Sequence, residues 1–177
     1  DDAAFTRCPF RGELVLPKNL KSIGSSAFRE CSFSGTLHLP STLLSIGESA
    51  FFYNHQLTGT LEIPEKITSI KEWAFGGCSQ IEGLVLPANM ETINSSAFEN
   101  CFNIGSIVCK GAEPAYVKSG AFDGVPKDNF TVEVPESAVA QYQTAVGWNE
   151  FKRIAAHHEL VCRPSIACAL ATEHKQS

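Results

Sequence analysis

A short motif recurs at a nearly constant interval along most of this chain, and internal repeats decide an architecture before other features do. In each copy a proline directly follows a short segment of alternating apolar residues. Successive prolines are 23, 24 and 23 residues apart, at Pro17, Pro40, Pro64 and Pro87. No single copy can enclose its own apolar side chains, so the copies must stack and bury these side chains between neighbours.

Further residues stand at fixed distances from each proline. An Ala-Phe pair follows ten and eleven residues later, and a Cys or Asn follows fourteen residues later. Because equivalent residues of stacked copies lie one above another, the phenylalanines are predicted to form one buried spine. They are Phe5, Phe28, Phe51, Phe75, Phe98 and Phe122. The residues predicted to occupy equivalent buried positions beside the spine are Cys8, Cys31, Asn54, Cys78 and Cys101.

Each copy divides into short pieces with different local structure. Residues 14–16, 37–39, 61–63 and 84–86 alternate with period two and predict strands, which the proline ends because it has no N–H for a ladder. A second short extended piece ends at Ile-Gly pairs, and Ala-Phe-x-x-Cys predicts one helical or 3₁₀ turn. The interval fits leucine-rich repeats. The predicted fold is mainly β: a short, curved leucine-rich-repeat solenoid, with a parallel sheet on one face and irregular or 3₁₀ turns opposite.

The pattern Leu-x-Leu-Pro-x-x-Leu-x-x-Ile-Gly-x-x-Ala-Phe-x-x-Cys, which covers about residues 1–135, resembles the repeats of BspA-like bacterial surface proteins. The resemblance implies an extracellular or cell-surface-anchored bacterial protein that adheres to host proteins or to other cells. It brings no catalytic residues with it. Two places depart from the pattern, since Asn54 replaces one Cys and residues 110–120 lack the motif proline.

A different kind of sequence follows the repeats. A cap is required because the last copy would otherwise expose apolar side chains to water. The residues place Val139, Tyr142 and Val146 on one face of a helix that begins after Pro135 and ends at Gly147. The segment also resembles the end of such arrays, with Tyr142, Gly147, Trp148, Phe151 and Ile154 matching. The predicted organisation is five to six repeat copies in 1–135, a helical cap in 136–155, and a tail, linker or start of a following domain in 156–177.

Charge and motifs argue against several classes of function. The formal net charge is −5, which gives no basic face for nucleic acid or an anionic membrane. The longest charge-free run, residues 31–47, is too polar to span a bilayer, and the opening Asp1-Asp2 is unlike a signal peptide. The chain has no Gly-x-Ser-x-Gly, phosphate-binding glycine loop or Cys-x-x-Cys, and His157-His158 is interpreted as a solvated pair. We therefore expect no enzyme, no cofactor and no metal site.

The seven cysteines raise the question of disulfides. Four of them recur at one repeat position, where a free thiol serves as a small hydrophobic group. We expect these to be reduced, structural thiols. Cys162 and Cys168 are the only pair whose spacing allows an ordinary local bridge, and whether they form one stays open.

Three aromatic residues break the repeat pattern at positions expected to face water. Phe52 and Tyr53 stand where other copies carry polar residues or glycine, and Trp73 stands where they carry serine. Exposed aromatic clusters often mark binding surfaces, so these three, with His55 and Glu72, are the candidate contact residues. Alternatively, Phe52 or Trp73 folds back over the edge of the array and covers exposed backbone. The competing site is the concave sheet face, which carries Val15, His38, Glu62, Val85, Val108 and Glu133.

Two functions from different classes follow. The favoured one is a non-enzymatic cell-surface adhesion module that recognises a host or microbial protein or glycan. The alternative is a structural spacer that presents a neighbouring domain at the cell surface. A binding module should expose a nonpolar or strongly charged patch, whereas a spacer should be uniformly polar.

Overall fold

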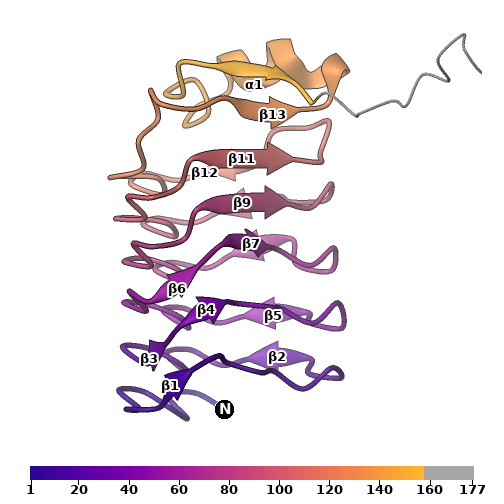
Figure 1. Ribbon diagram of the computed structural model, residues 1–177. Helices are drawn as coiled ribbons and strands as arrows, with labels where there is room; N and C mark the ends of the chain where they lie inside the picture. Colours follow the sequence, from indigo (N-terminus) through magenta and orange to yellow (C-terminus); the bar gives the residue numbers. More distant parts are fainter. Residues whose placement is uncertain (158–177) are drawn as a thin grey trace, which may run out of the picture.

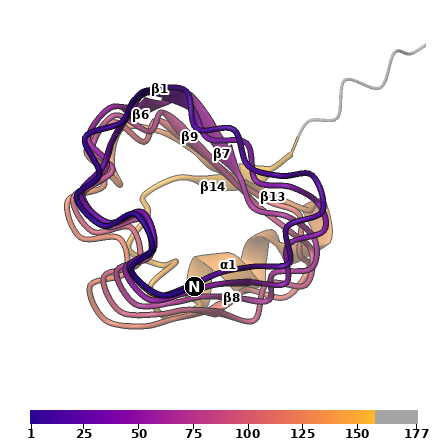
Figure 2. The same ribbon diagram turned by 90° about the horizontal axis from the view of Figure 1, so that it is seen from below.

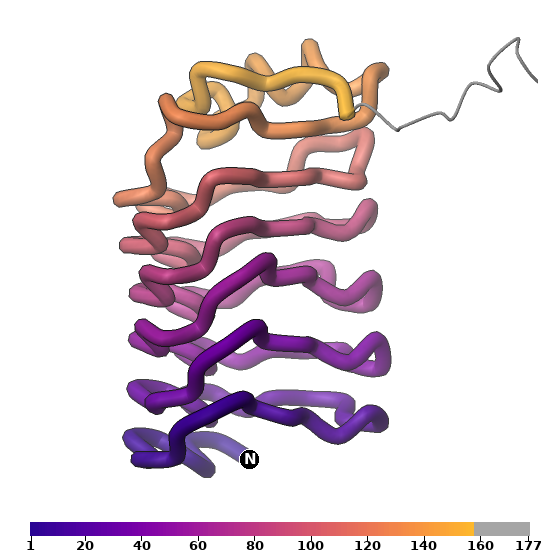
Figure 3. Tube along the Cα trace, viewed as in Figure 1, coloured from indigo at the N-terminus to yellow at the C-terminus, as the bar shows by residue number. Residues whose placement is uncertain are grey.

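The computed structural model describes residues 1–157. The chain winds into a coil, and each turn of the coil, or rung, is stacked on the previous one (Figure 1, Figure 3). This arrangement confirms the solenoid predicted from the sequence. Viewed along the stack, successive rungs nearly superimpose (Figure 2), so the stack is close to straight, whereas the sequence predicted a curved one.

One face of the coil carries a five-stranded parallel sheet in the order β14-β13-β11-β9-β7. Its pairing places Leu61, Leu84, Ile107, Val132 and Ile154 in one buried row, as expected for copies of nearly equal length. The strands are β7 (Thr60–Glu62), β9 (Gly83–Leu86), β11 (Ser106–Cys109), β13 (Val132–Val134) and β14 (Ile154–Ala156).

Two-residue strands on the opposite side of the coil also pair in parallel. The second side chain of each strand is buried, which confirms the second extended piece predicted from the sequence. One group pairs β2 (Ser22–Ile23) with β5 (Ser45–Ile46). The other pairs β8 (Ser69–Ile70), β10 (Thr92–Ile93) and β12 (Tyr116–Val117). Both sides of the coil are therefore hydrogen-bonded from rung to rung.

In the first copies the strands lie earlier than the sequence predicted. Residues 14–16 and 37–39 belong to no strand. Gly12 and Gly35, with φ of 95° and 84°, have a left-handed backbone that turns the chain just before these residues. Gly59, at the equivalent position, is also left-handed with φ of 71°, yet β7 follows it directly, so this turn does not by itself exclude a strand. Glu82 takes the same position without a left-handed backbone, and β9 there is longer. The early strands pair as β1 (Arg11–Gly12) with β3 (Ser32–Phe33), and as β4 (Gly35–Thr36) with β6 (Leu57–Thr58).

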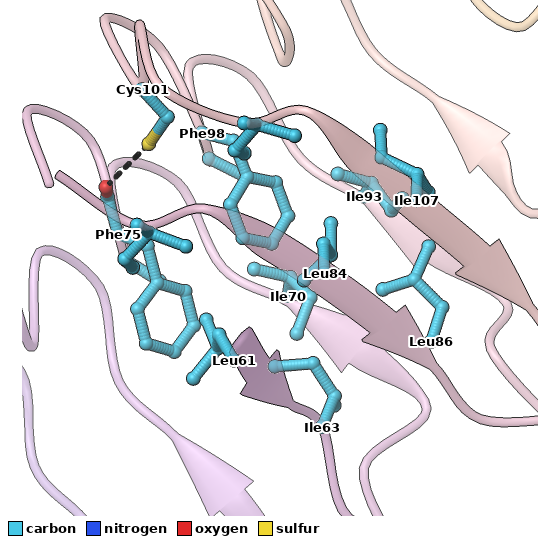
Figure 4. Close-up of a cluster of buried hydrophobic side chains, with 14 of the residues drawn as sticks. Leu61, Ile63, Ile70, Phe75, Leu84, Leu86, Ile93, Phe98, Cys101 and Ile107 are labelled. Atoms are coloured by element: carbon cyan, nitrogen blue, oxygen red, sulfur yellow. Dashed lines mark hydrogen bonds between the residues drawn. The ribbon is translucent and has the colours of Figure 1, made fainter. Parts of the chain in front are cut away.

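The repeated phenylalanines stack along the coil. From Phe5 to Phe122 the centroids of successive rings are 5.4, 5.3, 5.4, 5.6 and 5.6 Å apart, and the rings are nearly parallel. Phe75 and Phe98 are fully buried beside the leucines and isoleucines of the sheet (Figure 4). The first ring does not fit the prediction of a buried spine, because Phe5 has a ring on only one side and is 45% exposed.

The turn around each spine phenylalanine is not the helical or 3₁₀ turn that the sequence predicted. Residues two before and two after the phenylalanine have positive φ, as at Ser26 (55°) and Glu30 (54°) around Phe28. Such left-handed residues prevent the segment from continuing as a helix, so it forms only isolated turns. One of these turns is closed by the hydrogen bond from the Arg29 N–H to the Ser26 carbonyl at 3.1 Å. The N–H of Phe28 instead donates to the Ala50 carbonyl of the next rung at 2.8 Å. Bonds between rungs thus satisfy the backbone of these turns.

The repeat cysteines donate hydrogen bonds to the spine. The thiols of Cys31, Cys78 and Cys101 lie 3.0, 3.2 and 3.3 Å from the carbonyl oxygen of the phenylalanine one rung earlier, and Figure 4 shows the Cys101 bond. Asn54 replaces the thiol with an amide nitrogen that bonds two spine carbonyls, at 2.7 and 2.8 Å. The repeat cysteines are free, as predicted, although Cys8 in the first rung is only half-buried.

A short helix and a strand cap the stack. A 3₁₀ turn, η1 (Glu136–Ala138), leads into α1 (Val139–Thr144), and β14 then pairs with β13 at the edge of the sheet. Trp148 is fully buried, with its ring centroid 5.6 Å from that of Phe122 and its Nε1 donating to the Ala115 carbonyl at 2.9 Å. Val146 is 74% exposed rather than on the buried helical face, because the helix ends before it. The sequence did not predict β14.

Several predictions for the last part of the chain cannot be compared with the structure. The solvated pair includes His158, and the open disulfide question concerns Cys162 and Cys168. All three residues lie outside the described residues 1–157.

Removal of a spine ring should depend on its place in the stack. Phe75→Ala removes a fully buried ring with neighbours on both sides, so we expect the free energy of unfolding to fall by about 3–5 kcal/mol. Phe5→Ala should cost clearly less, because that ring is half in water. Urea unfolding of both variants measures the difference. Equal losses would contradict a stacked spine.

The buried thiols should not react with an alkylating reagent in the native protein, and they should react with it after unfolding. Burial raises the pKa of Cys78 and Cys109 to about 12, so at pH 8 the thiolate fraction is on the order of one in ten thousand. We expect alkylation of native protein to modify only Cys8 among the described cysteines. Denaturant without reductant should expose all five free thiols, including Cys31 and Cys101, to the reagent. Peptide mapping by mass spectrometry separates these sites, and recovery of one or none would reveal a disulfide framework.

Candidate functional site

Phe52, Tyr53 and Trp73, which we call the aromatic cluster, come together on the side of the coil that carries the turns. The centroids of Phe52 and Tyr53 are 4.4 Å apart, and those of Phe52 and Trp73 are 5.1 Å apart, both in edge-to-face geometry. His55 extends the cluster, with its ring 4.8 Å from that of Tyr53. Edge-to-face packing fixes the relative orientation of these rings.

Two glycines in the rung above Phe52 and Tyr53, which is the rung that carries Trp73, make room for the cluster. A Cβ on Gly76 would lie 2.7 Å from Cε3 of Trp73 and 3.2 Å from Cδ2 of Phe52, and a Cβ on Gly77 would lie 3.1 Å from Cδ2 of Tyr53. Phe52 and Trp73 are accordingly half-buried, whereas Tyr53 is 41% exposed. Two of the rings thus cover turn backbone, as the alternative from the sequence proposed, and the third presents itself to solvent.

The backbone under the cluster belongs to the fold, but the aromatic side chains do not. Tyr53 and Trp73 have φ of 59° and 57°, and the equivalent residues of other copies, such as Glu30 and Ser96, are also left-handed. Bulky residues rarely adopt this conformation, whereas small or polar residues tolerate it better. Tyr53 and Trp73 therefore occupy positions where a smaller or more polar side chain would be easier to accommodate.

A hollow of about 650 Å³, which we call the first hollow, lies on the N-terminal side of the cluster. Phe52, Tyr53 and His55 form one wall, and Arg29 and Glu30 of the rung below form the other. The Arg29 guanidinium lies 5.0 Å from the centre of the Phe52 ring, which is a cation–π contact. The first hollow therefore combines aromatic surface with an ordered charged group.

Glu30 is held by two arginines. Its carboxylate oxygens lie 2.7 Å from Nε of Arg7 and 3.0 Å from Nε of Arg29. These hydrogen bonds, that from Arg7 first, lower the pKa of the Glu30 carboxyl. The carboxylate thus stays charged and fixes the position of Arg29 over Phe52.

Two contributors to this surface did not appear among the residues predicted from the sequence. Phe102 is 56% exposed and stands where other copies have Ser, His or Pro, so the same comparison of copies could have found it. Arg29 occupies a position that is ordinarily polar, and only the stacking of rungs reveals its contact with Phe52. The predicted Glu72 is exposed and lines neither hollow beside the cluster, and its carbonyl accepts a hydrogen bond from the Ser49 N–H at 2.9 Å.

The competing sheet face is mixed in character. Glu62, Val85, Val108 and Glu133 lie in one row across the sheet. The carboxylate of Glu62 lies 3.3 Å from the Lys110 ammonium, and that of Glu133 lies 2.5 Å from Nδ1 of His157. Val15 is 80% exposed, and His38 is exposed as well. Its acidic groups lie beside basic side chains, so this face has no single sign of charge, and it carries no Phe, Tyr or Trp among these residues.

Residues 1–157 contain no group of three or more His, Cys, Asp or Glu side chains placed to hold a metal ion. No helix in this part of the chain has the length and apolar character needed to cross a membrane.

Comparison with known proteins assigns the repeats to a family. A family model described as the BspA type leucine rich repeat region matches residues 1–127, in 6 copies. The match contains the whole aromatic cluster and ends before the cap. No curated protein sequence matches the chain.

The fit between the cluster and Gly76 can be tested. Gly76→Ala places a methyl group 2.7 Å from Trp73, so we expect the ring to be displaced and to become more accessible to acrylamide quenching of tryptophan fluorescence. Gly105→Ala is the matched control, because its added Cβ would meet nothing closer than 3.9 Å. Quenching that is unchanged in Gly76→Ala would show that Trp73 does not pack on this glycine.

Proposed function

We propose that this chain, which belongs to the BspA-type leucine-rich repeat family, is a non-enzymatic binding module that acts outside the cell. Its partner is a host or microbial protein or glycan at a cell surface. Membership of this repeat family is consistent with a role in surface binding. A stacked scaffold also presents a rigid, preformed surface, which loses little conformational entropy when a partner binds.

The aromatic cluster is the observation that carries this proposal. Tyrosine and tryptophan dominate the energy of many interfaces, and here they occupy positions that the fold does not require. The cluster lies beside the first hollow, so a group of the partner that enters this hollow meets both aromatic surface and the Arg29 guanidinium. The sheet face is the competing surface. It is the weaker candidate for the binding site because its acidic side chains already contact basic side chains of the same chain.

A structural spacer remains the alternative class. A spacer gains nothing from exposed rings, which increase the risk of aggregation. Tyr53 and Phe102 are both exposed on the same side of the coil, so the described surface is not uniformly polar. This favours a binding module.

Replacing the cluster with residues used by other copies should separate binding from folding. In the triple variant Phe52→Ser, Tyr53→Glu, Trp73→Ser, we expect attachment to host cells or to immobilised matrix proteins to be lost. The free energy of unfolding should change by less than about 2 kcal/mol, because half-buried packing is lost while strain at left-handed positions is relieved. Binding to a sensor surface and urea unfolding measure the two effects.

The matched control is the double variant His38→Ser, Glu62→Ser on the sheet face, which should attach like the unmodified protein. Attachment lost only in this double variant would assign the site to the sheet face. If the folded, unmodified protein attaches neither to host cells nor to matrix proteins, this result would support the spacer instead.

A further inference from the structure

A second hollow lies on the C-terminal side of Tyr53 and His55. Its volume is about 460 Å³, within the usual range of small-ligand sites. Tyr53 and His55 form one wall, and Phe102, from two rungs further along the stack, belongs to the opposite wall. Between them the intervening rung contributes Gly77, which has no side chain, and Ser79, whose side chain is small, so the space stays open.

The aromatic walls are held in place and yet accessible. The Tyr53 ring packs against His55 and over Gly77, and it remains 41% exposed. Phe102 is 56% exposed, and its Cε1 would lie 3.0 Å from a Cβ on Gly124, so this ring rests on a glycine of the next rung. A ligand therefore meets apolar ring surface without first having to order it.

The remaining lining is polar and uncharged. Asn103 Nδ2 donates to Gln80 Oε1 at 3.0 Å, which orients both amides. This bond leaves the side-chain oxygen of Asn103 to accept a hydrogen bond from a ligand, and it leaves the NH₂ group of Gln80 to donate one. Asn100 and Ser79 add an amide and a hydroxyl. Among the described residues that line the second hollow there is no Lys, Arg, Asp or Glu.

We propose that the second hollow binds a neutral saccharide. The inference rests on the proposed binding function, of which it names the ligand class. A sugar ring has an apolar C–H face that suits an aromatic ring, and its hydroxyls both donate and accept hydrogen bonds, as this set of amides and hydroxyls requires. The lining contains no Lys or Arg, which distinguishes the site from one for sialylated or sulfated sugars, because these bind best to a permanent cation.

A protein partner fits the second hollow less well. An extended peptide usually adds to an open sheet edge, but the turns at this place use backbone N–H groups to bond the next rung, as Tyr53 does with Gly76 at 2.8 Å. A protein surface would also commonly bring charged groups, which find no partner among the lining amides.

Binding of the whole chain to an array of neutral oligosaccharides built from hexoses and N-acetylhexosamines tests the proposal. The same sugars carrying sialic acid or sulfate form the charged arm. We expect binding to neutral members, weakened at least about tenfold by Phe102→Ala and about fivefold by Gln80→Leu. Tyr116→Ala is the matched control, because Tyr116 is 64% exposed and does not line the second hollow. It should bind like the unmodified chain, and thermal unfolding of all variants should agree within about 2 °C.

Three results would overturn the proposal: no binding to any neutral sugar, binding confined to charged sugars, or unchanged binding by Phe102→Ala. Failure here is distinct from failure of the proposed function. If the chain attaches to host cells through the aromatic cluster but attachment survives glycosidase treatment and is lost on protease treatment of those cells, the partner is a protein and only the saccharide assignment is wrong. If the chain attaches to no cell, matrix protein or sugar, both are wrong.

Discussion

The contact between equivalent phenylalanine rings is the interaction on which the rest of this structure depends. Centroids 5.3 to 5.6 Å apart are too far for rings stacked directly face to face, so the rings are offset, which is the favoured geometry for aromatic pairs. The spacing is close to that of parallel strands, so the spine and the sheet can follow one rung interval. Each ring needs a neighbour on both sides. This explains why Trp148 and Phe151 close the far end and why Phe5 is partly in water.

A backbone that turns so tightly beside the core must have hydrogen-bond partners for its N–H and carbonyl groups. In this protein the partners come from neighbouring rungs. The carbonyls of Phe5, Phe51 and Phe75 each accept a hydrogen bond from a thiol. A thiol suits this site because it is small and gives up a proton only with difficulty once buried. Asn54 makes two hydrogen bonds in its place but leaves its Oδ1 buried without a partner. An unsatisfied buried oxygen costs about 1–3 kcal/mol, so the extra donor of asparagine is largely offset.

Much of the fold could be predicted from the sequence, because stacking converts one repeat position into one column of contacts. The left-handed turns could not be, since serine and glutamate have no local preference for that conformation and adopt it at Ser26 and Glu30 to bond the neighbouring rungs. β14 carries no repeat, and it forms a strand because β13 offers an open edge. The aromatic cluster was visible as a break in the pattern. Arg29 was not, because its contact with Phe52 exists only between rungs.

The same geometry explains how a binding surface can arise on such a scaffold. A large side chain at the turn of one rung lies over the turn of the next, and a glycine in that next turn makes room for it. Tyr53 rests on Gly77, and Phe102 rests on Gly124. An exposed ring of this kind is therefore a property of two successive copies. At Tyr53 the same glycine also lines the second hollow, so the support for the ring and part of the open space beside it come from one residue.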